Sequence, residues 1–439
     1  MTTSLLPSAV PSLVGVARTV STCEHAGTVS AAIGLTVEVD GLTCSIGQQV
    51  IVEALQPVLC QVVGFRANRT ILMPFADPTG IAAGNRAIAV GHGPRVVVGD
   101  GLLGRVLDGL GRPIDDGPSL RGRRTDLDQV GAGAHPLRRK PIAAPLTTGV
   151  RVLDGMLTCG RGQRLGIMAG SGVGKSTFLG MIARSSDCDV NVIALVGERG
   201  REVREFIEQN LGQDGLRRSV VVVATSDQSA LVRRNAAWVA ASIAEFFRDE
   251  GRNVLFMMDS VTRFAMAQRE IGLAIGEPPT TRGFTPSVFA ALPALLERAG
   301  CGETGTITGF YTVLVEGDDM NEPITDAVRG TLDGHIVLTR DLAAGNHYPA
   351  VDVLASISRL MPQLATKAHL IAAARMRTLL AAHRGSRDLL EIGAYVAGSN
   401  ADVDAAVARM PKILSFLRQD MHEASRWLDT LQRMEAVIQ

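Results

Sequence analysis

Residues 169–177 of this 439-residue chain read Ala169-Gly170-Ser171-Gly172-Val173-Gly174-Lys175-Ser176-Thr177, and this stretch decides the fold. An apolar run (165–168) precedes it, and a helix-like run (178–183) follows it. A strand, a glycine-rich loop and a helix in this order are what a phosphate-binding P-loop requires. Glycines let successive backbone N–H groups turn toward one anion, and the helix N-terminus adds its positive dipole end. The stretch therefore predicts a nucleotide phosphate site.

Two side chains at the end of this stretch carry charge and metal-binding capacity. Lys175 is placed to reach the β- and γ-phosphates of a nucleoside triphosphate, and the Ser176 hydroxyl is placed to bind Mg²⁺. One departure from the pattern is Ala169, which stands where the first glycine is usual. Only a positive φ demands glycine, so we expect Ala169 to keep a negative φ.

Composition bounds the class of protein. A chain of this length exceeds one hydrophobic core, which predicts two or three domains. Apolar residues make up 46%, charged residues 20%, and the formal net charge is zero, so composition argues against disorder and gives no sign of nucleic-acid binding. The six cysteines form no Cys-x-x-Cys pair, which is typical of reduced thiols in a cytosolic protein. The N-terminal segment lacks the features of a signal peptide, and no apolar run reaches the length of a membrane span.

The hydrophobic pattern divides the chain into three predicted domains. Residues 1–95 contain short β-rich runs between glycines from about Val14 onward, which predicts a small β-barrel with strands near 36–39, 49–52, 61–65 and 70–73. Residues 96–362 begin with a connector that runs to about Pro145. They continue as an α/β domain with buried parallel strands at 164–169, 190–196, 219–225, 254–258 and 305–315.

Residues 363–439 are predicted to be entirely helical. Helical periodicity covers 367–384, 386–396, 401–418 and 423–437. The predicted fold class is therefore an α/β P-loop core with an N-terminal β-barrel and a C-terminal all-α domain.

Two further acidic positions turn a phosphate site into a hydrolytic one. Asp259 ends the apolar run 254–258, and an aspartate at the carboxyl end of a buried strand can hold Mg²⁺ beside Ser176. Glu198 follows another strand, and hydrolysis needs a carboxylate that polarises a water molecule in line with the γ-phosphate. Glu202 is the alternative base, although helix capping or ion pairing suits it better. Arg199 fits phosphate neutralisation and pairing with an acid equally well.

Longer motifs now show a resemblance over nearly the whole chain. The sequence resembles the catalytic subunits of rotary-type ATPases, and most closely the ATPases of type III protein secretion, both flagellar and injectisome. The densest matches are DSVTRFAMAQREIGLAIGEPPTTRGFTPSVFAALPALLER (259–298), EGDDMNEPITDAVRGTLDGHIVL (316–338) and NHYPAVDVLASISR (346–359). The resemblance implies a RecA-like core, ATP as substrate and Mg²⁺ as cofactor.

The resemblance also assigns roles around the phosphates. It implies that Lys175 and Ser176 bind phosphate and Mg²⁺, that Asp259 is the Walker B acid and that Glu198 is the catalytic carboxylate. Arg199 matches an active-site arginine.

Four further roles come from the resemblance alone. Arg263 matches a phosphate-proximal arginine, and Tyr348 matches the aromatic residue that stacks on adenine. Arg359 matches the arginine finger donated to a neighbouring subunit's nucleotide. Phe416 falls at a second adenine-packing aromatic, and Met421 stands where rotary β-type subunits have a further phenylalanine. With the finger and the catalytic carboxylate on one polypeptide, identical subunits can complete every site in a closed ring.

The resemblance implies a cytoplasmic homohexamer at the inner-membrane face. Its implied partners are the stalk and stator proteins of the export apparatus and export chaperone–substrate complexes, with no nucleic acid. The MNEPI and NHYPAVDVLAS segments favour an injectisome over a flagellar system.

Two other functions compete with protein export. One is an ion-translocating rotary ATPase, but residues 389–404 lack the dense acidic run that rotary β subunits present to their shaft. The other is a ring-shaped RNA helicase, which needs a basic, aromatic-lined groove in which the N-terminal region is poor.

Overall fold

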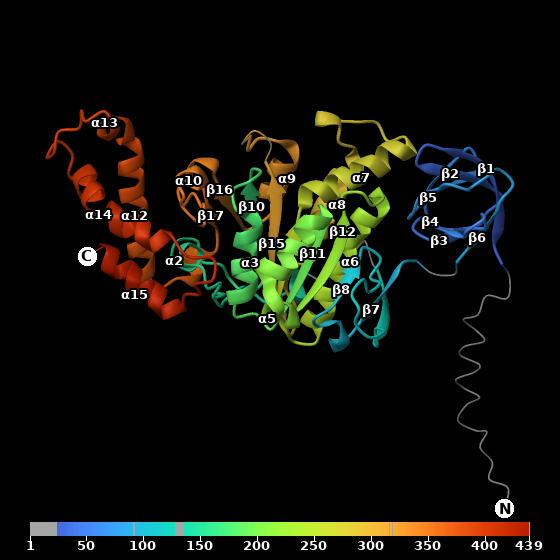
Figure 1. Cartoon of the computed structure of the whole chain (residues 1–439), viewed down its shortest axis with the longest axis horizontal. Helices are drawn as coiled ribbons and strands as arrows, with labels where there is room; N and C mark the ends of the chain where they lie inside the picture. Colours follow the sequence, from blue (N-terminus) through green and yellow to red (C-terminus); the bar gives the residue numbers. More distant parts are fainter. Residues whose placement is uncertain (1–23, 91–92, 128–135, 316, 318, 439) are drawn as a thin grey trace, which may run out of the picture. The chain divides into compact units, whose positions relative to one another are not determined.

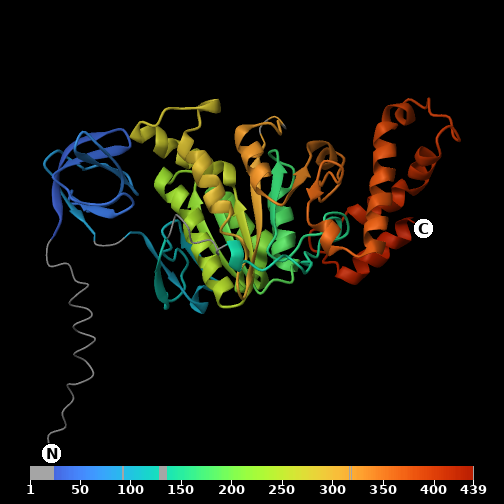
Figure 2. The same ribbon diagram turned by 180° about the vertical axis from the view of Figure 1, so that it is seen from behind.

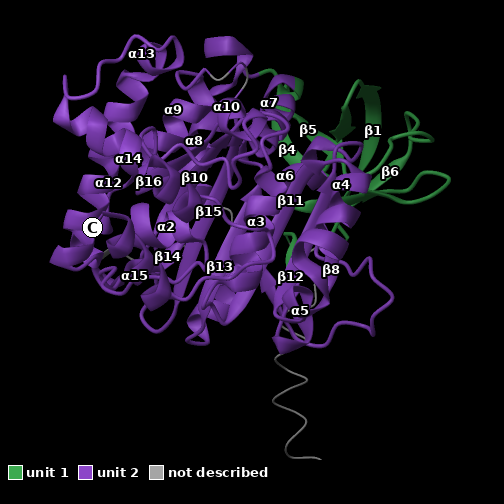
Figure 3. Cartoon of the chain, turned by 60° about the vertical axis from the view of Figure 1, so that its left-hand side comes forward, with its two compact units in different colours: residues 1–95, 274–276 green, residues 96–273, 277–439 purple. Residues whose placement is uncertain are grey.

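The computed structural model describes residues 24–90, 93–127, 136–315, 317 and 319–438 (Figures 1 and 2). The chain divides into two compact units (Figure 3). Unit 1 comprises residues 1–95 and 274–276, and unit 2 comprises residues 96–273 and 277–439. The predicted start of the barrel region near Val14 lies outside the described residues.

Unit 1 contains the predicted β-barrel. Among its described residues, six strands close in the order β1-β2-β5-β4-β3-β6. Their bounds are β1 (Ala26–Ile33), β2 (Thr36–Asp40), β3 (Gln49–Val52), β4 (Val58–Arg66), β5 (Arg69–Pro74) and β6 (Arg86–Ala89). Alternate side chains such as Val37, Val39, Val50 and Val52 are buried inside the barrel, which is the period-two pattern of a closed antiparallel sheet. The sequence predicted β2, β3, β4 and β5, whereas β1 and β6 were not predicted.

Unit 2 is built on one sheet that is parallel except at two short strands. Its order is β17-β16-β10-β15-β13-β11-β12-β8, with β14 paired to β15, which makes nine strands among the described residues. The bounds are β8 (Val106–Asp108), β10 (Arg164–Ala169), β11 (Val190–Glu198), β12 (Ser219–Thr225), β13 (Asn253–Asp259), β14 (Gly300–Cys301), β15 (Thr306–Leu314), β16 (Gly334–Leu338) and β17 (Ile357–Ser358). The five predicted parallel strands are confirmed, and burial on both faces explains why they read as continuous apolar runs.

The predicted connector before Pro145 is wrong in part. Residues 106–108 form β8, which extends the main sheet by pairing in parallel with β12, because the apolar Val106 and Leu107 can bury against that strand. Strands β7 (Arg95–Val98) and β9 (Arg123–Asp126) form a separate two-stranded sheet. Strands β16 and β17 also escaped prediction, since they are only five and two residues long.

Helices cover both faces of the main sheet, as Figure 1 shows for α3 and α6. Helix α6 contacts β11, β12 and β13, and its N-cap Ser229 accepts a hydrogen bond from the backbone of Val232. The helices of this region are α2 (Arg151–Met156), α3 (Lys175–Ser185), α4 (Gly200–Glu205), α5 (Gly212–Arg217), α6 (Ala230–Asp249), α7 (Val261–Ile275), α8 (Pro286–Leu296), α9 (Pro323–Thr331), α10 (Arg340–Ala344) and α11 (Met361–Leu364). A π-helical turn, η3 (Phe206–Leu211), joins α4 to α5, and short 3-10 turns lie at η1 (Asp100–Leu102), η2 (Pro136–Arg138) and η4 (Thr281–Gly283).

The C-terminal region is helical, as predicted. Its helices are α12 (Lys367–Gly385), α13 (Arg387–Glu391), α14 (Ala401–Leu417) and α15 (Trp427–Ile438). The predicted helix 386–396 is wrong after residue 391, because Gly393 adopts a positive φ of 69° and the chain turns. The last helix begins four residues later than predicted. No helix in the described part of the chain is both long and apolar enough to cross a membrane.

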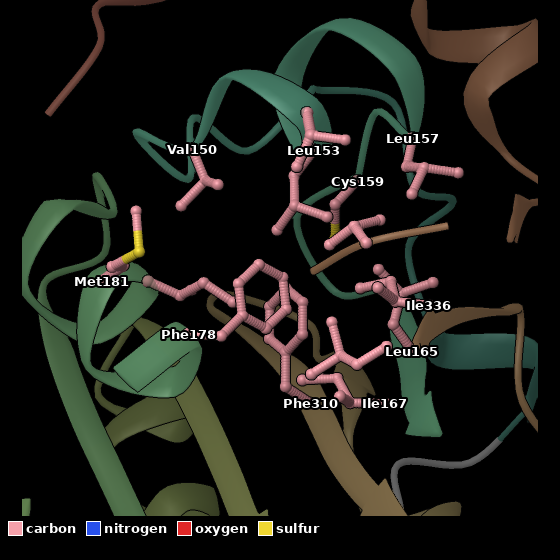
Figure 4. Packing of buried hydrophobic residues seen from close by; sticks show 14 of the residues in the cluster. Val150, Leu153, Leu157, Cys159, Leu165, Ile167, Phe178, Met181, Phe310 and Ile336 are labelled. Atoms are coloured by element: carbon pink, nitrogen blue, oxygen red, sulfur yellow. The ribbon is translucent and has the colours of Figure 1, made fainter. Parts of the chain in front are cut away.

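The nucleotide-binding region and the C-terminal helices share one hydrophobic core. Figure 4 shows Ile167 of β10, Phe178 of α3 and Phe310 of β15 in this cluster. The same cluster includes Met376 of α12 and Met434 of α15. The shared core therefore contains residues from both sides of the predicted domain boundary between residues 362 and 363. That boundary stays a prediction.

We expect Phe310→Ala to destabilise unit 2 by about 3–5 kcal/mol, because it empties a fully buried aromatic position. Both tryptophans of the chain, Trp238 and Trp427, lie in unit 2, so tryptophan fluorescence during urea unfolding reports on that unit. Ile371→Ala on α12 is the control, since this side chain is 60% exposed and its removal should cost within about 0.5 kcal/mol. Equal midpoints for the two variants would contradict the core assignment.

Candidate active site

The P-loop lies between β10 and α3, as the sequence predicted. Ala169 ends β10 with a strand conformation, so its side chain is tolerated where the pattern has glycine. Gly172 and Gly174 have φ values of 80° and 82°, which residues with a side chain rarely adopt. These two positions turn the loop so that α3 begins at Lys175 with its N-terminus toward the phosphate site.

Lys175 is the centre of a charge cluster that it forms with the last residues of two strands. Its ammonium group pairs with Asp259, the last residue of β13, and lies 3.6 Å from Glu198 Oε1 at the end of β11. The hydroxyl of Thr312 on β15 donates a hydrogen bond of 2.7 Å to Asp259 Oδ1. Parallel strands bring these groups together because their carboxyl ends meet at one edge of the sheet.

Burial and neighbouring charges shift two ionisable groups of this cluster in the same direction. Burial, followed by the charge of Asp259, raises the pKa of Glu198 to about 7. Burial alone would lower the pKa of Lys175, but the charges of Asp259 and Glu198 outweigh it and raise that pKa. A carboxylate that titrates near neutral pH suits a general base better than an ordinary glutamate.

A close backbone approach places Arg263 beside Glu198. Gly197 has a φ of 74°, and a Cβ at this position would lie 2.8 Å from the Cβ of Arg263 on α7. The Nε of Arg263 is buried and has no hydrogen-bond partner among the described residues. Such an unpaired donor fits an anionic ligand.

Arg199 lies on the exposed side of the same region. Its guanidinium is 3.5 Å from Glu202, and its backbone N–H donates to the other oxygen of Glu202. Glu202 therefore caps helix α4, which is the role that the sequence analysis preferred for it.

These groups surround a cavity of about 560 Å³, which we call the phosphate cavity. It is lined by P-loop residues 169–172 and 174–177, together with Gly197, Glu198, Arg199, Glu202, Ser226, Arg263, Leu314, Val315, Gly317 and Arg340. The hydroxyl of Ser176 and the carboxylate of Asp259 are oxygen donors of the kind that Mg²⁺ prefers, so the residues present fit this ion. Arg340 was not predicted as a site residue, because it lies between the motifs 316–338 and 346–359.

A second cavity, of about 530 Å³, adjoins the first at Gly174 and Thr177, which line both. We call it the base cavity. Its lining includes Phe178, Met181, Asn346, Tyr348 and Pro349 and one segment from the C-terminal region, residues 418–421. Tyr348 is 42% exposed, so its ring is open to a flat apolar ligand.

Phe416 is not among the residues that line the base cavity, and its predicted contact with adenine stays a prediction. Its ring is buried in the core, where a Cβ on Gly155 would lie 2.9 Å from it, and α14 turns that side chain toward α2. Met421 lines the cavity instead. The sequence indicated that the base cavity differs here from that of rotary β-type subunits, since Met421 stands at the position of one of their phenylalanines.

Buried polar contacts hold the C-terminal wall of the base cavity. Gln419 donates its backbone N–H to the Tyr348 carbonyl at 2.9 Å and its side-chain amide to the Gly149 carbonyl at 2.8 Å. Arg151 donates to the Phe416 carbonyl at 2.9 Å, and Arg184 of α3 donates to the Met421 carbonyl. No sequence pattern marked Arg151, Arg184 or Gln419, because their contacts with Phe416, Met421 and Gly149 join residues that are distant along the chain.

Arg359 is not brought together with the other predicted site residues. It follows β17, the edge strand of the sheet, and its exposed guanidinium donates to the Arg329 carbonyl at 3.4 Å. It lines neither cavity. Within one chain, the site thus lacks the predicted finger.

Two sequence profiles match this chain. Residues 149–358 match the nucleotide-binding domain of the ATP synthase alpha/beta family. Residues 365–436 match the T3SS EscN ATPase C-terminal domain.

Similar proteins cover nearly the full chain. A flagellum-specific ATP synthase of Bacillus subtilis strain 168 is 55% identical over 90% of this chain and 91% of its own length. A type 3 secretion system ATPase of Xanthomonas euvesicatoria is 51% identical over 94% of this chain and 93% of its own length.

Two solved structures are also similar. The assembled ATPase EscN of the enteropathogenic E. coli type III secretion system is 44% identical, with a TM-score of 0.90 over 94% of this chain and all of that one. EscN in complex with its central stalk EscO is 43% identical, with a TM-score of 0.87 over the same shares.

The raised pKa of Glu198 predicts a pH-dependent effect of Glu198→Gln on stability. Since the pKa is about 7 in the folded protein and 4.5 ordinarily, the folded state binds more protons between these values and loses stability as pH rises. Glutamine does not titrate. We therefore expect the thermal midpoint of the nucleotide-free variant, relative to the unmodified protein, to be higher at pH 8 than at pH 5.

The measurement is differential scanning calorimetry of both proteins at the two pH values. The pH 5 scans are the internal control, because folded Glu198 is then protonated. A relative midpoint that falls from pH 5 to pH 8 would show that Glu198 is stabilised as a carboxylate, contrary to this prediction.

Proposed function

The chain belongs to the ATP synthase alpha/beta family and, within it, to the ATPases of type III secretion and flagellar export, and from this premise we propose that it hydrolyses ATP at the interfaces of a homohexameric ring to energise protein export. The observation that carries the proposal is the meeting of Lys175, Glu198 and Asp259 at one sheet edge beside a nucleotide-sized pair of cavities.

Each residue of the site has a proposed part in hydrolysis. Adenine lies against Tyr348, and the P-loop backbone and Lys175 hold the phosphates. Ser176 and Asp259 would hold Mg²⁺, which when bound neutralises developing phosphate charge. Glu198 orients the attacking water and accepts its proton, while Arg199 and Arg263 stabilise charge on the phosphates. Binding of the nucleotide must first release Lys175 from its pairing with Asp259.

We propose that Arg359 completes the site of a neighbouring subunit. Its exposed position after the edge strand β17 supports this role, because a side chain there can reach beyond its own chain. A head-to-tail contact repeated around a ring supplies one finger to every site. The similarity to the assembled EscN structure supports such a ring.

The proposed partners follow from the relatives. A stalk protein is proposed because EscN has been solved with its central stalk EscO. Stator proteins and export chaperone–substrate complexes, and a location at the cytoplasmic face of the inner membrane, are proposed from the family resemblance. The match of residues 365–436 to the EscN C-terminal domain favours export over ion translocation.

The kind of export system has two candidates. The MNEPI and NHYPAVDVLAS segments favour an injectisome. The 55% identity to the flagellum-specific protein of Bacillus subtilis supports flagellar export. Co-purification of the full chain from its native host distinguishes them, because the two systems have different export-gate and stator components.

We expect Arg359→Ala to bind ATP within about twofold of the unmodified protein but to lose about 10³–10⁵ in turnover, because the finger stabilises charge that develops only in the transition state. Phosphate release and equilibrium nucleotide binding are measured on the same preparations. Undiminished hydrolysis would overturn the assignment of Arg359.

Mixing two inactive variants tests whether the finger acts between subunits. Arg359→Ala keeps its P-loop, and Lys175→Ala keeps its finger. In an equal mixture about a quarter of the interfaces would pair an intact P-loop with an intact finger, so activity should return to that extent. The control mixture combines Lys175→Ala with Arg375→Ala in place of Arg359→Ala. Arg375 is an exposed arginine on α12 that pairs with Asp402. A mixture as inactive as its components would contradict a site shared between subunits.

A further inference from the structure

Arg340 lines the phosphate cavity and lies just beyond strand β16, outside the motifs that marked the other site residues. Strand β16 runs parallel to β10, with Leu338 opposite Ala169, the first residue of the P-loop. Arg340 comes two residues later and begins α10. The sheet register therefore carries this arginine past the strand end to the side of the P-loop, where it lines the phosphate cavity.

The position of Arg340 relative to the base cavity indicates which phosphate of a bound nucleotide it would face, namely the terminal one. Residues 340–348 follow the length of the site, because Arg340 lines the phosphate cavity whereas Asn346 and Tyr348 line the base cavity. The two cavities meet at Gly174 and Thr177. If the base of a nucleotide lies on Tyr348, its first phosphates lie where the two cavities meet. The terminal phosphate then lies deeper in the phosphate cavity, toward Arg340.

The charges of the cavity leave Arg340 available for a ligand. Lys175 pairs with Asp259 and Glu198, and Arg199 pairs with Glu202. The guanidinium of Arg340, by contrast, forms no hydrogen bond or ion pair with any residue that the structure describes, and it is exposed. Arg263 enters from α7, after β13, whereas Arg340 enters from the β16 side, so the two arginines flank the P-loop.

We propose that Arg340 binds the terminal phosphate of ATP and so makes the site discriminate ATP from ADP. This inference rests on the proposed function. A guanidinium presents paired N–H donors that match two oxygens of a phosphate, and a point charge such as lysine supplies only part of that contact. The interaction is present with ATP and absent with ADP, which lacks the phosphate concerned.

The test compares nucleotide affinities of the purified full chain with Arg340→Ala and Arg340→Lys. The probes are the magnesium complexes of the non-hydrolysable ATP analogue AMP-PNP and of ADP, titrated at one fixed salt concentration. We expect Arg340→Ala to weaken AMP-PNP binding about ten- to a hundredfold and to change ADP binding less than about twofold. Arg340→Lys should lie between these values for AMP-PNP.

Two control variants separate the possible failures. Arg375→Ala removes the same charge from α12 and should leave both affinities unchanged. Lys175→Ala should weaken both nucleotides, and its failure to do so would overturn the proposed function itself. If Lys175→Ala behaves as expected but Arg340→Ala binds AMP-PNP normally, or loses ADP equally, the terminal-phosphate role of Arg340 is wrong. Unchanged thermal midpoints of the nucleotide-free variants would exclude misfolding as the cause of a loss.

Discussion

The ion pair between Lys175 and Asp259 is the interaction on which the rest of the site depends. It links the first residue of α3 to the last residue of β13, and the hydroxyl of Thr312 holds the carboxylate from β15. A buried charge of either sign is costly without its partner, so neither group can move alone. In the proposed function, a phosphate that pairs with Lys175 would replace Asp259 and Glu198 as its partner, which would couple phosphate binding to the charge of Glu198.

A second constraint joins the nucleotide site to the C-terminal helices. The base cavity takes one wall from residues 418–421, and Arg151, Arg184 and Gln419 hold that wall through backbone carbonyls and a side-chain amide. Because α12, α14 and α15 share the core of the nucleotide-binding region, a nucleotide that fills the base cavity contacts both parts at once. This arrangement offers a direct mechanical route from ATP to the C-terminal region.

The sequence predicted the residues that meet at the site well where a local pattern marks each of them. The P-loop, the strand ending at Asp259 and the glutamate after β11 each carry a local pattern, and the structure brings Lys175, Asp259 and Glu198 together. The five buried parallel strands were also predictable, because burial on both faces leaves an uninterrupted apolar run. Strands β8, β16 and β17 were not, since they are short and lie at or near the sheet edges.

The sequence by itself therefore determined which charged residues meet beside the P-loop, because those residues are neighbours along the chain or end long apolar strands. Only the tertiary structure decided the base cavity and the full set of arginines that line the phosphate cavity. Phe416 and Met421 are five residues apart, and only the turn after α14 puts one in the core and the other in the cavity. Arg340 reaches the P-loop solely through the register of β16 against β10, a pairing between residues about 170 apart that no local pattern encodes.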